Sequence, residues 1–392
     1  MSEIIRVAAR GDGVTADGRH AAFAAPGDTL TESGAVIPGP HHQPPPCRHF
    51  PQCGGCQLQH LDDASYAAFV TDRVATALAA QDIATSIRPA HVSPPRTRRR
   101  ATLHAERGLV GFTEEKSHRI VDMRECHILT PELFALVAPL RALLQRLKVK
   151  GRAELHLTLA DQGADLLVNA KLPAGLAAAE ALTAFAQHHA LARISVDEGY
   201  GPETRWEPQP VTITFGRTAV ALPPAAFLQA TVEGEAALVA AVREATAGAV
   251  TTADLFAGLG TFTLALPGKV YAAEGARDAL MALKAAAAQR AVFPEHRDLY
   301  RRPLTTAELD RFDAVVLDPP RAGAREQVAH LADARCRTIA YVSCNPASFA
   351  RDARTLADGG WRLDWVQPVG QFRWSTHVEL AARFSKPPSS RP

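Results

Sequence analysis

The sequence predicts an α/β fold whose C-terminal part, residues 211–392, is a doubly wound and mainly parallel sheet. The first observation is four short apolar stretches after Pro210: VTTADLFAGLG, KVYAAEGA, FDAVVLDPPRAG and CRTIAYVSCNP. The second is that each stretch ends in turn or polar residues. The third is that helical patterns, such as that of residues 276–289, separate the stretches. Buried strands that alternate with helices are typical of such a sheet.

The segments before residue 211 predict two smaller units. Residues 1–46 contain short β-type fragments followed by the proline-rich linker PGPHHQPPP, in which the prolines prevent regular structure. Residues 47–210 form a central domain, where alternating apolar runs after Arg98 predict antiparallel strands with two helices between them. A helix over residues 65–80, with Ser65 as its N-cap, could pack on the C-terminal domain.

Composition indicates a folded protein of two or three domains with a basic middle. The chain has 392 residues, of which 47% are hydrophobic and 21% charged, as in soluble proteins. The net charge is only +2, but residues 88–152 hold 14 Lys and Arg against 6 Asp and Glu. Such a segment suits binding to a phosphate backbone, and it suits a solvated face equally well.

The lack of targeting signals predicts a cytoplasmic chain. The N-terminus lacks the apolar region of a secretory signal, and no run of about 18 apolar residues predicts a membrane span. The six cysteines should therefore be reduced, and clusters of them indicate metal binding or catalysis rather than disulfides.

Polar or glycine-rich residues follow all four predicted buried strands. They are Phe256–Gly260, Glu274, Asp318 and Cys344. Ligands of doubly wound sheets bind at the carboxyl ends of the strands, so we expect these residues to lie together around a ligand.

The first two strand ends predict a nucleoside cofactor. Gly258 and Gly260 allow the backbone to approach a ligand closely, and Glu274, 14 residues after Gly260, suits the two hydroxyls of a ribose. The loop lacks the GxGxxG pattern of dinucleotide sites. This favours S-adenosylmethionine over NAD or FAD, with Asp318 beside the adenosine.

Cys344 is the predicted nucleophile. Enzymes that methylate an exocyclic amine commonly carry an aromatic residue after the two prolines of such a loop, and cytosine-5 enzymes often carry a cysteine after a proline there. Here Arg321 follows Pro320. A buried structural cysteine is the ordinary alternative for Cys344, but the polar turn residues around it favour an exposed position.

A thiol at this place suits methylation of carbon 5 of uracil. Addition of a thiolate at C6 makes C5 nucleophilic, and a base must later remove the C5 proton so that the thiol can leave. Glu379 is a candidate base, because its apolar neighbours would raise its pKa. His377 is a rival for that role.

The chain resembles the bacterial RNA uracil-5-methyltransferases, especially the iron–sulfur members that act on 23S rRNA. The resemblance runs from about residue 47 to about residue 380. Seven motifs in order carry it: CRHFPQCGGC, MRECHIL, PPAAFLQAT, DLFAGLGTFTL, LDPPRAGA, YVSCNP and THVEL.

The resemblance implies a Rossmann-like class I methyltransferase domain at the C-terminus and assigns its site. Cys344 would be the nucleophile and Glu379 the base. The implied contacts to S-adenosylmethionine are Gln229, Phe256, Thr261, Glu274, Asp298 and Asp318. Thr261 departs from the family, because an Asn often stands there. The family's N-terminal barrel of the oligonucleotide-binding (TRAM) type is expected as a shortened remnant, since the first 40 residues should hold too few strands for a full barrel.

Four cysteines predict a metal centre. Cys47, Cys53 and Cys56 have the spacing C-x5-C-x2-C, and Cys126 is the fourth cysteine before residue 300. Four thiolates hold either zinc or a [4Fe–4S] cluster, and spacing does not decide between them. The resemblance favours the [4Fe–4S] cluster, as a structural clip between the N-terminal segment and the central domain. Cys336 is expected in the core.

Arg98, Arg99 and Arg100 are the predicted RNA contacts, with Arg98 and Arg100 on one face of a strand. A solubilising edge strand is the alternative. Phe227, Phe372 and Trp374 are candidates for stacking on a flipped-out uridine.

The expected substrate is a uridine of 23S rRNA, whose position the sequence does not identify, and a monomer is expected. A uridine in the T-loop of tRNA is the main alternative substrate. A non-catalytic RNA-binding assembly factor is the alternative of another class.

Overall fold

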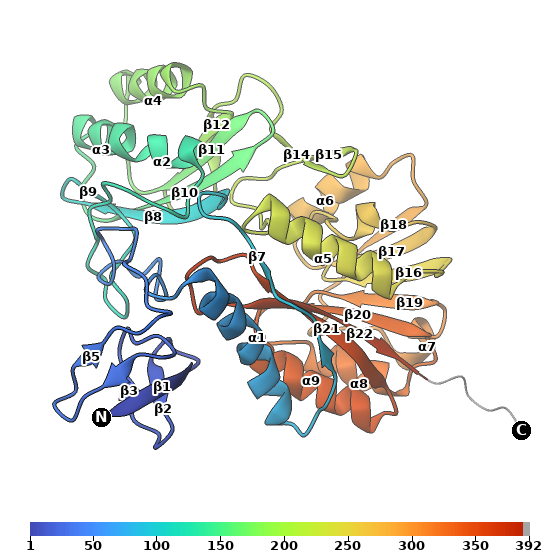
Figure 1. The fold of residues 1–392 in the computed structure, drawn as a ribbon. Coiled ribbons are helices and arrows are strands. Elements are labelled where there is room, and N and C mark those ends of the chain that lie inside the picture. The colour runs from blue at the N-terminus through green and yellow to red at the C-terminus, as the bar shows by residue number, and fades with distance from the viewer. Residues whose placement is uncertain (387–392) are drawn as a thin grey trace, which may run out of the picture.

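The computed structural model describes residues 1–386 and contains four separate β-sheets. The chain forms a small N-terminal sheet, a central domain and a large C-terminal domain (Figure 1). The C-terminal domain also includes α1 (Asp63–Ala79) and the strands β6 (Ser86–Ile87) and β7 (His91–Val92), which precede the central sheet in the sequence. None of the helices in the described residues is long and apolar enough to cross a membrane.

The N-terminal unit is a five-stranded antiparallel sheet with the order β3-β2-β1-β4-β5. Its strands are β1 (Ser2–Val7), β2 (Gly13–Thr15), β3 (His20–Ala21), β4 (Thr29–Leu30) and β5 (Val36–Ile37). The expectation that the first 40 residues hold too few strands was therefore wrong. Five strands fit because most of them are only two or three residues long and are joined by tight turns.

The predicted helix 65–80 is α1 (Asp63–Ala79), and it belongs to the C-terminal domain. Its N-cap is Asp62, whose carboxylate accepts a hydrogen bond from the Ser65 backbone N–H at 2.7 Å, so the predicted cap Ser65 was wrong. The helix packs against α9 (Pro346–Asp358) and β21 (Arg362–Gly370). The packing expected for this helix is thereby confirmed.

The central domain is a mixed sheet with helices on one face. The order of its six strands is β13-β12-β11-β10-β8-β9. The strands are β8 (Arg100–Glu106), β9 (Leu109–Gly111), β10 (Ala153–Ala160), β11 (Gly163–Asn169), β12 (Arg193–Asp197) and β13 (Glu203–Trp206). The strands pair antiparallel except β11 and β12, which are parallel because a helix connects them. The structure has three helices where two were predicted: α2 (Pro131–Ala135), α3 (Val137–Arg146) and α4 (Leu176–His188).

The alternation of buried and partly exposed residues along β8 shows which face of this sheet is left uncovered by helices. Ala101, Leu103 and Ala105 are buried in a core shared with α2, α3 and α4. The residues that alternate with them, Arg100, Thr102 and His104, point away from that core and line a cleft. The helices therefore cover one face of the sheet (Figure 1), and the opposite face carries polar residues that line the cleft.

The C-terminal domain is built on a nine-stranded sheet with the order β18-β17-β16-β19-β20-β22-β21-β6, and β7 also pairs with β21. Its strands are β6 (Ser86–Ile87), β7 (His91–Val92), β16 (Thr251–Leu255), β17 (Lys269–Glu274), β18 (Val292–His296), β19 (Ala314–Leu317), β20 (Thr338–Ser343), β21 and β22 (Glu379–Ser385). The five strands from β18 to β20 are parallel, and β22 runs antiparallel to both of its neighbours. The predicted doubly wound, mainly parallel sheet is confirmed.

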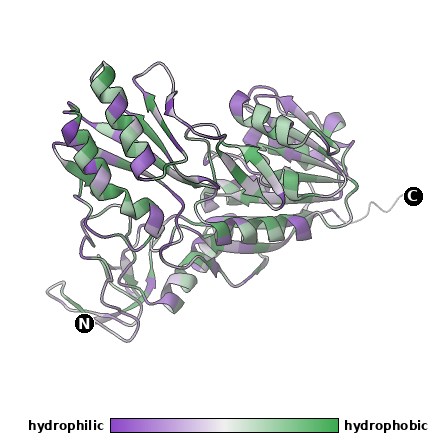
Figure 2. Ribbon diagram, turned by 90° about the horizontal axis from the view of Figure 1, so that it is seen from above, coloured by the Kyte–Doolittle hydropathy of each residue, from purple (hydrophilic) through white to green (hydrophobic). Residues whose placement is uncertain are grey.

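Helices cover both faces of this sheet. The remaining helices are α5 (Val232–Ala245), α6 (Arg277–Ala286), α7 (Thr306–Leu309) and α8 (Arg325–Asp333), with the short 3-10 helix η1 (Thr263–Ala265) and the hairpin β14 (Thr212–Phe215) and β15 (Thr218–Ala221) beside them. α5 packs on the strands β20 and β22 from one side, and α1, α8 and α9 share a core on the other side. The sheet strands are mostly hydrophobic, whereas the helices mix hydrophobic and hydrophilic residues (Figure 2). Cys336 lies in this core, as expected.

Candidate active site

The carboxyl ends of the parallel strands meet at one edge of the sheet. Leu255, the last residue of β16, pairs with Ala273 of β17 and with Leu317 of β19. In the same way Leu317 pairs with Tyr341 of β20. Phe256, Glu274, Asp318 and Cys344 are therefore neighbours at this edge, which confirms their predicted placement.

Cys344 and Glu379 come from adjacent strands. Ser343 of β20 pairs with Leu380 of β22, so the following residue Cys344 lies opposite the preceding residue Glu379. The Glu379 side chain is buried, whereas Cys344 is half-buried. Both line a single cavity of about 740 Å³.

Burial controls the protonation of both residues. Desolvation raises the pKa of Glu379 to about 7, although the Gln371 amide and the charges of Arg100 and Arg321 partly offset it. Desolvation also raises the pKa of the Cys344 thiol to about 11, and the nearby carboxyls of Glu379 and Asp318 add to this rise. The thiol is therefore neutral in the free cleft, with Arg321 as the cation that favours its ionised form.

The cavity lies between the C-terminal domain and the open face of the central sheet. One wall carries Cys344, Glu379 and Arg321, and the opposite wall carries Arg100 with polar residues of β8 and β10. His377 lies in the same cavity, with its Nδ1 3.3 Å from Arg321 Nη2. Partial burial and this arginine lower the pKa of His377.

Arg100 and Phe227 form a stacked pair in the cavity. The Phe227 side chain is 61% exposed, and the Arg100 guanidinium carbon lies 4.3 Å from the centre of its ring. Arg98 lies 5.3 Å from the Phe372 ring centre. Of the three aromatic stacking candidates, Phe227 and Phe372 line the cleft, while Trp374 is only 4% exposed and packs beside Cys56.

Arg99 lies on the opposite side of the strand from Arg98 and Arg100. Its side chain is buried, with Nη2 2.5 Å from Glu235 and Nε donating to the Gln229 carbonyl at 3.1 Å. All of its visible contacts are thus made inside the protein. The prediction that Arg99 binds RNA has no support from this placement.

The loop after β16 forms a turn around the Glu274 carboxylate. Glu274 accepts hydrogen bonds from the backbone N–H groups of Gly258 at 2.8 Å and Ala276 at 2.6 Å. Phe256 and Gly258 both have a positive φ, of 64° and 56°. For Phe256 this conformation is strained, and such strain gathers at ligand sites.

Acidic groups dominate this edge. The buried Asp254 accepts from the Thr263 hydroxyl at 2.5 Å through one oxygen, and its other oxygen has no hydrogen-bond partner within the described residues. Desolvation raises the pKa of Asp254 to about 7 and that of Asp318 well above its usual range. Carboxyl groups suit the hydroxyls, amine and sulfonium of S-adenosylmethionine and would repel a pyrophosphate. The residues present therefore fit this cofactor.

Gln229 is buried and is linked through Gln371 to Glu379. Its side-chain oxygen accepts from Gln371 Nε2 at 2.6 Å, and Gln371 Oε1 accepts from the Ala230 backbone N–H at 2.8 Å. Thr261 is half-buried in the loop after β16, and Asp298 is exposed after β18. Both lie near the same edge of the sheet as Glu274.

Comparison with known proteins places the chain in a family. Residues 225–386 match the family described as tRNA (Uracil-5-)-methyltransferase. An uncharacterised RNA methyltransferase of Zymomonas mobilis is 50% identical over 98% of this chain and 100% of that protein. The 23S rRNA (uracil(1939)-C(5))-methyltransferase RlmD of Shewanella frigidimarina is 32% identical over 87% of this chain and 82% of its own length. The chain belongs to the RNA uracil-5-methyltransferases.

A solved structure supports the fold of this methyltransferase. The Pyrococcus abyssi tRNA (uracil-54, C5)-methyltransferase, in complex with S-adenosyl-L-homocysteine, superposes with a TM-score of 0.77. The two chains are 22% identical, and the match covers 98% of each. At this identity the likeness shows a shared fold, which is that of a class I methyltransferase.

The four predicted metal-binding cysteines of this methyltransferase line one small pocket. Cys47, Cys53, Cys56 and Cys126 share it with apolar side chains, and desolvation raises the pKa of each thiol. Within residues 1–386 no three His, Cys, Asp or Glu residues are close enough to hold one ion. In a [4Fe–4S] cluster each thiolate binds a different iron atom, so the sulfur atoms lie farther apart than around one ion. The structure groups the four cysteines around one pocket.

The glycines of this segment are required by close backbone contact. A Cβ on Gly54 would lie 2.7 Å from the Thr113 carbonyl oxygen, which accepts the Gly54 backbone N–H at 2.9 Å. The Gly55 backbone N–H faces the Cys53 thiol. Of the two glycine N–H groups, that of Gly55 therefore faces a thiol and that of Gly54 pairs with the backbone.

Sequence reasoning missed two residues next to the candidate site of this methyltransferase. Asp254 looked like part of an ordinary strand, but an acidic residue inside a buried apolar strand is itself a signal. Tyr300 contacts Phe256, with 5.5 Å between their ring centres. No local pattern marks Tyr300, because the contact joins loops that are far apart in the sequence.

Proposed function

We propose that this methyltransferase modifies C5 of a uridine in 23S rRNA and that Cys344 is the nucleophile. The observation that carries the proposal is the pairing of Cys344 with Glu379 on one wall of a cleft whose opposite wall is basic. A thiol next to a carboxyl of raised pKa supplies the two functions that uracil-5 chemistry needs.

The Cys344 thiol first gives up its proton to solvent. The thiolate then adds to C6 of the uracil, forming an S–C6 bond and moving electrons to C5 and O4. Arg321 offsets the negative charge of the thiolate and of the enolate that forms. Because the uridine must leave its helix to reach Cys344, Phe227 and Arg100 offer it a stacking surface.

Once C5 carries the methyl group, Glu379 removes the C5 proton, and the electrons of the C–H bond re-form the C5–C6 double bond and expel the Cys344 thiolate. A carboxyl with a pKa near 7 is half ionised at neutral pH and thus accepts a proton readily. His377 is the rival base, but it lies beside the Arg321 cation and lacks the register that places Glu379 opposite Cys344.

S-adenosylmethionine supplies the electrophilic methyl group that C5 takes up. The residues proposed to hold it are Gln229, Phe256, Thr261, Glu274, Asp298 and Asp318. Glu274 would bind the ribose hydroxyls, and Asp318, beside Glu379 and Cys344 in the same charge network, would face the reacting end of the cofactor.

Arg98 and Arg100 are proposed to bind RNA phosphates. Arg98 also connects the cleft, which it lines, with the cysteine pocket. Its backbone N–H donates to the carbonyl of Ile128 at 2.9 Å, and Ile128 lies two residues after Cys126. We propose that Cys47, Cys53, Cys56 and Cys126 hold a [4Fe–4S] cluster that fixes this connection and takes no part in the chemistry. A ribosomal substrate implies a cytoplasmic enzyme, and we propose that it acts as a monomer.

The choice of 23S rRNA is supported by the relative that acts on it and by the four cysteines. A tRNA uridine is the alternative substrate, and the description of the matched family favours it. The test is methyl transfer from labelled S-adenosylmethionine to 23S rRNA and to bulk tRNA from a strain that lacks this protein, followed by mapping of 5-methyluridine by mass spectrometry. Methylation of tRNA alone overturns the rRNA proposal, and methylation of neither RNA favours an assembly factor.

A further inference from the structure

The loop 298–304 touches the two loops that surround the candidate cofactor site. It follows β18, which pairs with β17 next to Glu274. The Tyr300 ring contacts Phe256 of the first loop, and the Tyr300 hydroxyl donates to the Gly323 carbonyl of the loop that begins at Asp318, at 3.2 Å. The position of loop 298–304 therefore affects both sides of the site.

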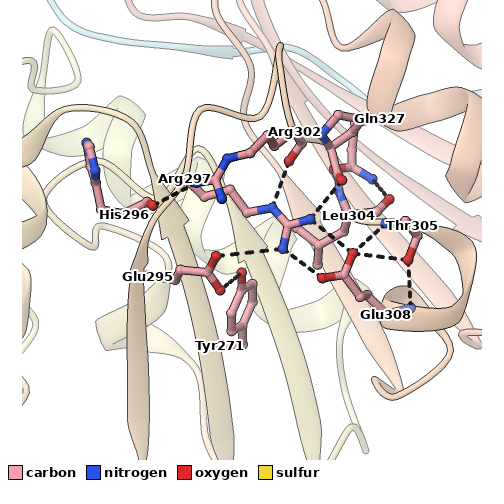
Figure 3. Close-up of polar contacts among 10 residues, drawn as sticks. Tyr271, Glu295, His296, Arg297, Arg302, Leu304, Thr305, Glu308 and Gln327 are labelled. Carbon is pink, nitrogen blue, oxygen red and sulfur yellow. Dashed lines mark hydrogen bonds and ion pairs between the residues drawn. The ribbon is translucent and has the colours of Figure 1, made fainter.

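The Arg297 side chain holds the second half of this loop, residues 302–304, in place (Figure 3). Its Nη1 and Nη2 donate to the two Glu308 carboxylate oxygens at 2.8 and 3.0 Å. Its Nε donates to the Arg302 carbonyl at 2.7 Å, and Nη2 also donates to the Pro303 carbonyl at 2.8 Å. A planar guanidinium with fixed N–H directions can make these contacts together, and a lysine ammonium cannot.

The side chains of Glu308 and Gln327 make further hydrogen bonds to the end of this loop. Glu308 also accepts from the Thr305 backbone N–H at 2.8 Å and so starts α7, and the Arg297 contact lowers the pKa of Glu308 to about 2. Gln327 of α8 accepts from the Leu304 N–H at 2.8 Å and donates to the Leu304 carbonyl at 3.0 Å.

The first half of the loop, residues 298–300, is held by a hydrogen bond within the loop and by the backbone of Arg297. Asp298 Oδ1 accepts from the Tyr300 N–H at 3.0 Å. The Arg297 N–H donates to the Glu274 carbonyl at 3.0 Å. Arg297 thus links the strand end that carries Glu274 to the loop that carries Asp298 and Tyr300.

We propose that Arg297 is a positioning residue for cofactor binding: it holds loop 298–304 in place as a wall of the adenosine pocket. The proposal rests on the cofactor site described under the proposed function. Arg297 itself touches no reacting group, because its guanidinium is occupied by Glu308 and by the two carbonyls.

The test uses Arg297→Lys and Glu308→Gln in the full-length protein. Calorimetry gives the Kd for S-adenosylhomocysteine without RNA, and steady-state assays give kcat and the KM values for S-adenosylmethionine and for RNA. We expect the Kd and the KM for the cofactor to rise about tenfold, as for a site whose wall has shifted, while kcat at saturation and the KM for RNA stay within about twofold. Arg354→Lys is the matched control, because it alters an arginine–carboxylate pair on the surface of α9.

Unchanged affinity for S-adenosylhomocysteine in the variants overturns the proposal, even if their Tm falls. An equal loss of affinity for cofactor and RNA overturns it too, because that is the result of general unfolding. If Arg297→Lys fails to fold, Glu308→Gln decides, since it keeps the shape of the side chain. Cofactor binding is measured without RNA, so a wild-type protein that binds S-adenosylhomocysteine but methylates no uridine contradicts the proposed function and leaves this proposal standing.

Discussion

Glu379 lies directly opposite Cys344 across β22 and β20, because Ser343 and Leu380 form the last pair of these antiparallel strands. The register alone brings a carboxyl and a thiol together that are 35 residues apart in the sequence. The charge of Glu379 adds to the desolvation that raises the pKa of Cys344 and of Asp318, so the Cys344 thiol is neutral in the free site.

Replacement of Cys344 by Ala should abolish methyl transfer and leave cofactor binding intact. In the proposed reaction the thiol forms the bond to C6, and the proposed cofactor contacts lie on other strand ends. Methyl transfer to RNA and calorimetry with S-adenosylhomocysteine measure the two properties. Cys336→Ala is the control, since Cys336 is buried in the core, and it should keep its activity. Normal turnover by Cys344→Ala would refute the assignment of the nucleophile.

Glu379→Gln should stop the reaction after methylation and before release. The amide cannot take the C5 proton, so RNA stays bound covalently to Cys344. Denaturing gels should then show a protein–RNA adduct that depends on S-adenosylmethionine and is absent from Cys344→Ala. His377→Asn is the comparison variant. An adduct with His377→Asn and free turnover with Glu379→Gln would assign the base to His377.

Glu379→Gln should also stabilise the protein at alkaline pH. The pKa of Glu379 rises from 4.5 to about 7 on folding, so its contribution to stability is present below pH 4.5 and is lost as the pH rises through 7. Ionisation of the buried carboxyl then costs on the order of 3 kcal/mol. Glu379→Gln should thus gain stability over the wild type at pH 8 and little at pH 4.5, as measured by urea unfolding. An equal effect at both values would mean that burial does not perturb this carboxyl.

The catalytic edge was more predictable from the sequence than the cleft that faces it. Strand ends followed by Phe256, Glu274, Asp318 and Cys344 are local patterns, and a parallel sheet brings them together by a general rule. Arg99 was misjudged because its contact with Glu235 depends on the docking of two domains. The N-terminal strands were underestimated because two-residue strands leave hardly any periodic pattern.

Phe227→Ala should weaken RNA binding and leave the cofactor site unaffected. The exposed ring and Arg100 form a stacking surface, and such stacking contributes about 1–3 kcal/mol per base. The KM for RNA should rise roughly tenfold, with an unchanged Kd for S-adenosylhomocysteine. Phe293→Ala is the matched control, because Phe293 is also an exposed phenylalanine, at 56%, but lies on β18 and not in the cleft. Equal effects of both substitutions would argue against a stacking role.

Loss of the proposed cluster should loosen the connection between the cysteine pocket and the cleft. The N–H groups of Gln57 and Leu58, next to Cys56, donate to the Trp374 carbonyl at 2.8 and 2.9 Å, five residues before Glu379. Cys56→Ser should therefore lower the iron content, the Tm and the affinity for RNA together, since binding of a metal centre stabilises the fold that holds it.

Iron and sulfide analysis, the visible spectrum after reconstitution and thermal unfolding measure these effects. Cys336→Ser is the control and should keep the full iron content. A colourless protein with one zinc per chain would replace the cluster by a zinc site. Full iron content in Cys56→Ser would remove Cys56 from the ligand set.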